Sequence, residues 1–225
     1  MEKKSLNVIE VVKGGCEIGV KNAASLVGAL FLWIITIWIP YLNVGTTIAI
    51  NTIPLELSKG KVISPFFIFD GKYRQYMGEY FTLIGLMWLA IIPALFFLIV
   101  PGIIIALGWS LALYILLDKG VAPGEAMIRS NKATYGNKWS IFFVGLILCF
   151  ISGLLNIIAG WLGELFWPLL WLVIAIVITQ AISLGCWACI YKQLVLTDEQ
   201  GLTEEPEEPA EALAETATEA PATEE

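Results

Sequence analysis

The sequence has 225 residues, of which 58% are hydrophobic and 15% are charged, and its mean hydropathy is +0.78. A soluble domain of this length needs much more polar surface to cover its core, so the composition excludes a soluble globular protein. The formal net charge of −7 arises at the C-terminal end, where the residues from Thr197 onward include 11 acidic and no basic side chains. The rest of the chain carries 13 basic and 9 acidic residues and is therefore cationic.

The N-terminal segment, residues 1–22, is predicted to be amphipathic and to lie on the membrane surface. Its four lysines alternate with glutamates, and no uninterrupted apolar stretch of signal-peptide type occurs among them. We therefore expect no cleavable signal peptide, and the first membrane span acts as its own insertion signal.

Six membrane spans are predicted from the lengths of the apolar runs and from the residues that interrupt them. The spans cover approximately residues 23–41, 44–57, 80–100, 103–117, 139–159 and 165–191. The longest apolar run, 80–117, would measure about 57 Å as one straight helix, whereas a bilayer core is only about 30 Å thick.

Pro101 and Gly102 lie in the middle of that longest run and are predicted to form the turn of a hairpin. Proline lacks an amide hydrogen and disfavours helical geometry at the residue before it, and glycine accepts the backbone angles of a reversal. The alternative is a proline kink within one steeply tilted helix.

The basic residues test the number of spans independently, because all 13 fall on one side of the membrane if there are six. The positive-inside rule makes that side the cytoplasm. We therefore expect an all-α fold, a polytopic membrane helical bundle of six transmembrane helices in three hairpins, with both termini cytoplasmic. Pro40 precedes Gly60 by 20 residues and Pro101 precedes Gly120 by 19, which fits a repeated hairpin and chance equally well.

Two cytoplasmic loops are predicted to contain amphipathic interfacial helices, in "PFFIFDGKYRQYMGEYF" and "APGEAMIRSNKATYGN". Aromatic and basic residues on one short helix suit the headgroup zone, and Pro123 suits a first helical turn. The candidate contacts to lipid headgroups are Lys72, Arg74, Arg129, Lys132 and Lys138. The simpler role of these residues is to orient and anchor the chain. The acidic tail, residues 196–225, is too poor in large apolar residues to fold and is predicted to be disordered.

No catalytic, cofactor-binding or metal-binding site is predicted. The chain has no histidine, no nucleophile motif and no glycine-rich phosphate loop. Cys186 and Cys189 have a CxxC spacing that elsewhere indicates redox or zinc chemistry. Because these two cysteines lie in an apolar helix and the chain has no second cysteine pair, we interpret them as small apolar residues on one helix face.

Polar residues within the spans are the strongest candidates for a functional cluster. They are Thr47, Asn51, Thr52 and Glu56 in the second span, together with Gln180 in the sixth. Such groups should face protein or water rather than lipid. They either line a polar pathway or form hydrogen bonds between helices, and the packing role is the favoured interpretation.

The stretches "VPGIIIALGWSLALYILLDKG" and "GEAMIRSNKATYGNKWSIFF" resemble a family of prokaryotic integral membrane proteins of unknown function. Relatives of that family form the membrane domain of some glycerophosphodiester phosphodiesterases. The matching residues are Pro101, Gly102, Ser110, Tyr114, Glu125, Ala126, Ser130, Gly136, Asn137 and Lys138. The resemblance covers roughly residues 5–195 and implies a six-span bundle in the prokaryotic cytoplasmic membrane. The catalytic domain has no counterpart here, so its activity does not carry over.

The sequence therefore favours a non-enzymatic membrane protein that organises or senses the membrane, or scaffolds a partner at its cytoplasmic face. The alternative is a transporter, a channel or a lipid-translocating subunit with a polar pathway at the second span. An enzymatic activity on lipid is disfavoured because the chain lacks a recognisable set of catalytic acid and base residues. The expected partners are membrane lipids and either another protein or a second copy of the chain, with no nucleic acid and no cofactor.

Overall fold

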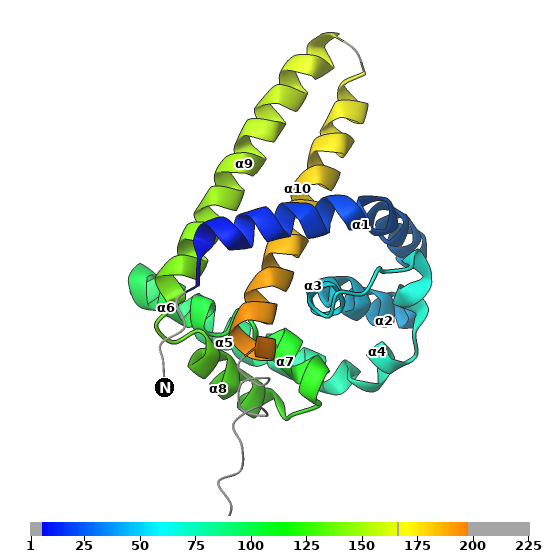
Figure 1. Ribbon diagram of the computed structural model, residues 1–225. Helices are drawn as coiled ribbons and strands as arrows, with labels where there is room; N and C mark the ends of the chain where they lie inside the picture. The colour runs from blue at the N-terminus through cyan, green and yellow to red at the C-terminus, as the bar shows by residue number, and fades with distance from the viewer. Residues whose placement is uncertain (1–5, 166, 198–225) are drawn as a thin grey trace, which may run out of the picture.

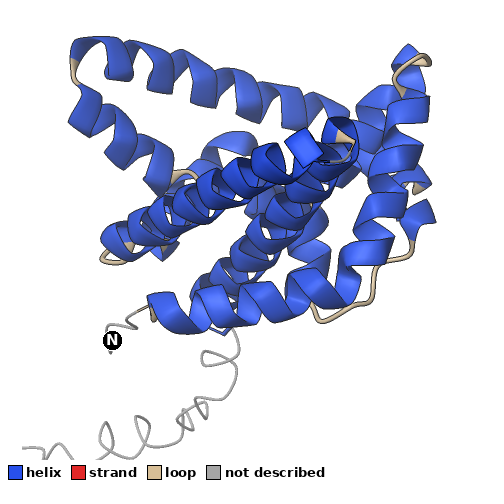
Figure 2. Ribbon diagram, turned by 90° about the horizontal axis from the view of Figure 1, so that it is seen from above, coloured by secondary structure: helices blue, strands red, loops and turns tan. Residues whose placement is uncertain are grey.

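The computed structural model describes residues 6–165 and 167–197, and within these ranges every regular element is a helix (Figures 1 and 2). The predicted acidic tail, beyond Thr197, lies outside the described residues. The helices in chain order are α1 (Val8–Thr36), α2 (Pro40–Asn51), α3 (Ile53–Ser58), the 3-10 helix η1 (Pro65–Phe69), α4 (Lys72–Gln75), α5 (Met77–Phe97), α6 (Ile99–Gly108), α7 (Ala112–Lys119), α8 (Pro123–Ala133), α9 (Lys138–Leu165), α10 (Pro168–Tyr191) and the π-helical turn η2 (Lys192–Leu196).

The described part of the chain has five helical segments that are long and apolar enough to cross a membrane. They are Val8–Thr36, Met77–Phe97, Ile99–Lys119, Lys138–Gly163 and Leu170–Leu196. The prediction of an all-helical membrane protein is thereby confirmed. The predicted second span corresponds to α2 and α3, which are separated at Thr52. Pro54 causes this break, because a proline inside a continuous helix would clash with the carbonyl of Ile50 and could not donate to it.

The interruption inside the longest apolar run lies at Leu98, not at Pro101 and Gly102 as the sequence suggested. Leu98 has extended backbone angles (φ −151°, ψ 106°), and α6 begins at the next residue. Pro101 belongs to the first turn of α6, where the missing amide hydrogen costs nothing because that turn has no intrahelical acceptor. Gly102 packs against Leu95 of α5, where a Cβ would lie 2.7 Å from a Leu95 methyl carbon. The glycine therefore serves close packing of the two helices and not the turn.

Helix α1 continues without interruption across the predicted boundary between a surface segment and the first span at residues 22 and 23. The Asn7 side chain caps the helix by accepting a hydrogen bond from the Ile9 amide at 3.2 Å. The predicted N-terminal segment is therefore, from Val8 onward, the first half of a 29-residue helix.

Helix α1 crosses α10 at very short range (Figure 1). A Cβ on Gly19 would lie 2.5 Å from the Ala181 carbonyl oxygen, and one on Gly185 would overlap the Gly15 carbonyl oxygen. Small residues four apart on both helices, Gly15 with Gly19 and Ala181 with Gly185, allow this approach. Cys186 and Cys189 are buried free thiols on the same face of α10, in the role of small apolar residues that the sequence indicated.

Helices α9 and α10 form a long hairpin whose far ends project beyond the other helices (Figure 1). The chain enters α10 through Trp167, which has a left-handed backbone (φ 47°). Large apolar side chains are exposed along the projecting part, among them Phe150, Ile157 and Trp161. The main hydrophobic core lies at the opposite end of the hairpin, where α7, α8, the start of α9 and the end of α10 meet.

The two interrupted helices, α2–α3 and α6–α7, share a plan. Each begins with a proline in its first turn, is interrupted midway and ends on a Lys-Gly pair. Gly60 and Gly120 follow the last helical turns with left-handed backbones (φ 72° and 62°) that glycine adopts without a steric penalty. Helix α10 ends differently, in the π-helical turn η2.

Candidate functional site

The predicted polar residues of the second span face several directions. The Thr47 hydroxyl accepts a hydrogen bond from the Trp33 indole at 3.0 Å and donates to the Asn43 side chain at 3.2 Å. The Thr52 hydroxyl is buried and bonds to the carbonyl oxygens of Ile48 and Ala49 at 3.0 and 2.9 Å. These two threonines therefore satisfy neighbouring groups within the helix pair, which is a packing role.

Asn51 and Gln180 line a common cavity of about 460 Å³ between α1, the α2–α3 interruption, α7 and α10. The Asn51 amide nitrogen donates to the Tyr80 hydroxyl at 2.9 Å, so its amide oxygen is the group that can accept from a ligand. Tyr114 and Ser183 add hydroxyls, and the remaining lining residues are apolar. Because no lining residue is charged, the cavity suits an uncharged molecule with one or two hydrogen-bonding groups.

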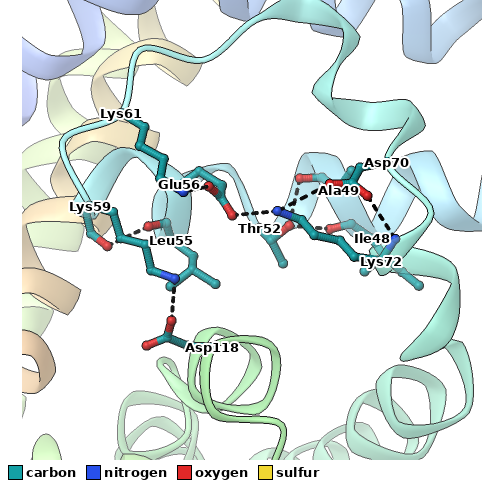
Figure 3. A network of polar contacts seen from close by, with 11 residues as sticks. Ile48, Ala49, Thr52, Leu55, Glu56, Lys59, Lys61, Asp70, Lys72 and Asp118 are labelled. Atoms are coloured by element: carbon teal, nitrogen blue, oxygen red, sulfur yellow. Dashed lines mark hydrogen bonds and ion pairs between the residues drawn. The ribbon is translucent and has the colours of Figure 1, made fainter.

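Glu56 lies apart from that cavity in a network of carboxylates and lysines (Figure 3). Its side chain is only 14% exposed and pairs with Lys72 at 3.0 Å and Lys61 at 3.6 Å. Lys72 also pairs with Asp70 at 3.7 Å. Glu56 therefore ties the end of α3 to the loop that contains η1 and α4, and it does not join Asn51 and Gln180.

Asp118 is the third carboxylate drawn in Figure 3, and nothing in its sequence position predicts a pair with Lys59. Its side chain is 7% exposed, and the Lys59 ammonium lies 2.5 Å away. Lys119 lies at 3.6 Å, and the Tyr191 hydroxyl donates to the same carboxylate at 2.8 Å. One buried carboxylate at the end of α7 therefore contacts both the residue that follows α3 and the last residue of α10.

The environment of Glu56 changes the protonation of its neighbours outside the membrane spans. Burial opposes the charged form of Lys72, but the hydrogen bond to Glu56 and the electrostatic attraction of Tyr73 and Glu56 together outweigh it and raise the pKa of the ammonium. Burial, reinforced by the negative charge of Glu56, raises the pKa of the Tyr73 hydroxyl. Lys72 also lies 4.8 Å from the centre of the Tyr73 ring. Lys72 is thus a firmly charged partner of Glu56.

The interruption between α6 and α7 is stabilised by α8. The Ser130 hydroxyl donates to the Gly108 carbonyl at 2.7 Å and accepts from the Leu111 amide at 3.2 Å. The Thr134 hydroxyl, one helical turn further, bonds to the same carbonyl at 3.2 Å. Both side chains are fully buried. The i, i+4 spacing of Ser130 and Thr134 places both hydroxyls on one face of α8, and this is visible in the sequence. The sequence does not show that both hydroxyls bond to the Gly108 carbonyl.

The predicted headgroup contacts do not form one cluster. Lys72 is engaged by Glu56, and Arg129 is paired with Glu125 one turn away at 2.6 Å. Arg74 packs its side chain against Gly45 of α2, where a Cβ would lie 2.7 Å from its Cγ. Lys132 is exposed on α8, and the Lys138 ammonium lies 2.9 Å from the Asn131 amide oxygen.

Among the residues that the structure describes, no three histidine, cysteine or carboxylate side chains are grouped to hold a metal ion. Comparisons with protein-family models, curated protein sequences and solved structures found no match.

Proposed function

We propose that this chain is a non-enzymatic multi-pass protein of the prokaryotic cytoplasmic membrane. In this proposal it organises or senses the membrane and scaffolds a protein partner at its cytoplasmic face. The observation that carries the proposal is the convergence of the segments expected in the cytoplasm. The Leu6 amide donates to the Asn137 side chain at 3.0 Å, Lys59 pairs with Asp118, and Tyr191 bonds to Asp118.

The proposed topology has six crossings, with α2 and α3 together forming the second. From Pro40 to Ser58 the two helices could extend about 28 Å, close to the thickness of a bilayer core. The three proposed hairpins are α1 with α2–α3, α5 with α6–α7, and α9 with α10. An even number of crossings leaves both termini and all basic residues on the cytoplasmic side. The resemblance of residues 5–195 to a six-span prokaryotic family supports the same arrangement.

Impermeant thiol labelling in intact cells tests this topology. Single cysteines replace Trp38, Glu79 and Ala122, all exposed, in a background without the native cysteines. We expect labelling of position 38 from outside, and labelling of positions 79 and 122 only after the cells are opened. Labelling of positions 79 and 122 from opposite sides would contradict both the α5–α6 hairpin and the six crossings.

The proposed partner site includes the acidic segment from Thr197, whose negative charge disfavours anionic lipid and suits a cationic protein surface. Crosslinking and affinity capture with the full chain and with a chain lacking residues 197–225 test this role. We expect the truncated chain to lose partners. Identical partner lists would remove the tail from the proposal.

The alternative function, passage of a molecule through or into the membrane, draws support from the cavity that Asn51 and Gln180 share. Because that cavity has no charged lining residue, its cargo would be uncharged. Cysteines placed at 51 and 180 should react with a small hydrophilic thiol reagent if the cavity is hydrated, with a cysteine at buried Thr52 as the matched control. Equal lack of reaction at all three positions contradicts a hydrated pathway.

A further inference from the structure

A groove between α6 and the junction of α8 with α9 is separate from the cavity at Asn51. It has a volume of about 540 Å³. Helix α6 contributes one wall and the start of α9 the other, and the lining residues are Val100, Ile103, Ile104, Leu107, Tyr135, Gly136, Lys138, Trp139 and Phe142. Along α6 the lined segment spans about 10 Å, so the groove is elongated in the direction of a transmembrane helix.

The groove carries positive charge at one end. The Lys138 ammonium lies beside Gly108, the last residue of α6, where a Cβ would lie 3.2 Å from Nζ. The carbonyl end of a helix favours a cation. Within the described residues the hydrogen-bond partner of Lys138 is the neutral Asn131 amide oxygen, whereas Lys59 and Lys72 have carboxylate partners. An ammonium has three donors, so Lys138 can bind an anion while it keeps Asn131.

Aromatic side chains border the charged end. Tyr135 and Trp139 are 76% and 74% exposed, and Trp139 contacts Phe142 edge-on with ring centres 6.1 Å apart. Tyrosine and tryptophan favour the level of lipid headgroups, where one part of the ring is apolar and the other is wet. The groove thus passes from a polar, aromatic end, marked by Lys138, to a purely apolar floor, marked by Ile103 and Ile104.

We propose that this groove is a binding site for an anionic phospholipid, with the phosphate at Lys138 and one acyl chain along Ile103, Ile104 and Leu107. A free phosphate leaves the apolar floor uncovered. A zwitterionic lipid brings a second cation close to Lys138, so an anionic headgroup is preferred. Basic pockets between transmembrane helices near the cytoplasmic surface have the same chemistry. The inference rests on the proposed function and names the lipid class that the membrane-sensing role involves.

Native mass spectrometry of the full chain in detergent tests the site, with phosphatidylglycerol and phosphatidylcholine as probes at equal concentration. The unmodified chain should bind the anionic lipid preferentially. Lys138→Gln should lower this preference about fivefold, the effect of one lysine near an anionic surface. Lys138→Arg keeps the charge and should keep the preference. Lys132→Gln removes an exposed lysine that does not line the groove and should change the preference by less than about twofold.

Ile104→Trp tests the acyl-chain part of the site. Ile104 is 46% exposed, so the larger ring can occupy the groove without displacing the core. Binding of both lipids should fall in this variant. The proposal is overturned by equal effects of Lys138→Gln and Lys132→Gln, by no anionic preference in the unmodified chain, or by unchanged binding in Ile104→Trp. None of these outcomes bears on partner binding by the acidic segment, which the truncation experiment tests. The lipid-site proposal and the partner proposal can therefore fail independently.

Discussion

Glycines occur both at the α1–α10 crossing and on the projecting end of the α9–α10 hairpin, but the two regions solve different packing problems. At the crossing, a Cβ on Gly19 would lie 2.5 Å from a backbone oxygen of α10, and Gly185 has no room for one. On the hairpin, a Cβ on Gly153 or Gly160 would meet nothing within 4 Å. The same residue type therefore marks helix–helix contact in one region and an open helix surface in the other.

This difference shows that hydrophobicity alone does not distinguish a protein contact from a lipid contact. Lipid tails are as apolar as leucine, so helices in a membrane associate through close packing and hydrogen bonds. At the crossing, short side chains bring the backbones together. On the hairpin, large side chains such as Phe150 and Trp161 remain exposed for lipid to cover. Four measurements can break or sharpen this comparison.

The largest effect is expected for Gly185→Ala, because the new methyl group would overlap the Gly15 carbonyl. We expect it to lower the free energy of unfolding by about 2–3 kcal/mol, the upper part of the usual range for overpacking. Thermal unfolding in detergent, followed by circular dichroism, measures this change.

The matched control is Gly153→Ala on the projecting hairpin. It should leave stability unchanged or raise it by roughly 0.5–1 kcal/mol, since alanine is the better helix former. A destabilised Gly153→Ala variant would show that this face of α9 contacts protein, and the comparison would then fail.

The second effect concerns a polar contact within the protein. Ser130→Ala removes the hydroxyl that serves both the Gly108 carbonyl and the Leu111 amide, and we expect a loss of about 2 kcal/mol. Thr82→Ala is the control, because its exposed hydroxyl bonds only to the Gly78 carbonyl of its own helix. Similar midpoints of thermal unfolding for the two variants would contradict a supporting role of α8 at the α6–α7 interruption.

A smaller loss, about 1 kcal/mol, is expected for Asp118→Asn, because the lysine partners of this carboxylate are partly exposed to solvent. The change removes the charge that Lys59 and Lys119 share but keeps a group that can accept from Tyr191. Glu125→Gln breaks the exposed pair with Arg129 and should cost only about 0.3 kcal/mol. Unfolding of both variants at low and high salt separates the two cases, because screening weakens the exposed pair more. If high salt reduces the loss for Asp118→Asn by the same fraction as the loss for Glu125→Gln, the buried network is contradicted.

The smallest effect is one of reactivity and leaves stability unchanged. Cys149 is exposed on α9, whereas Cys186 is buried against Gly15 at the crossing. N-ethylmaleimide in detergent should modify Cys149 well before Cys186, and peptide mass spectrometry can follow both sites in one sample. Modification at equal rates would indicate that α1 and α10 separate readily.

The sequence alone determined the elements whose cause is local. Long apolar runs predict helices of membrane-spanning length, and five such helices are present among the described residues. Pro123 begins α8 as its fixed backbone angle suggests. Two glycines with left-handed backbones also act locally: Gly120 follows α7 directly, and Gly136 belongs to the turn between α8 and α9.

Local rules left the turn at Leu98 undetermined. A proline is compatible with a reversal and with the first turn of a new helix, and the contact of Gly102 with Leu95 favours the second. The uninterrupted course of α1 was missed for a related reason. Its charged first half looks like a surface segment until Gly15 and Gly19 are seen against α10.

Only the tertiary structure decided which distant groups meet. Asn51 and Gln180, 129 positions apart, reach one cavity, whereas Glu56, five residues from Asn51, faces lysines instead. In the sequence, Lys59 and Asp118 each look like a charged residue at the solvated end of a helix. Nothing in their spacing predicts that they form an ion pair. The physical reason is that spacing along one helix specifies which residues share its face. Which helix covers that face depends on how the whole set of backbones packs, and that packing is a property of all the helices together.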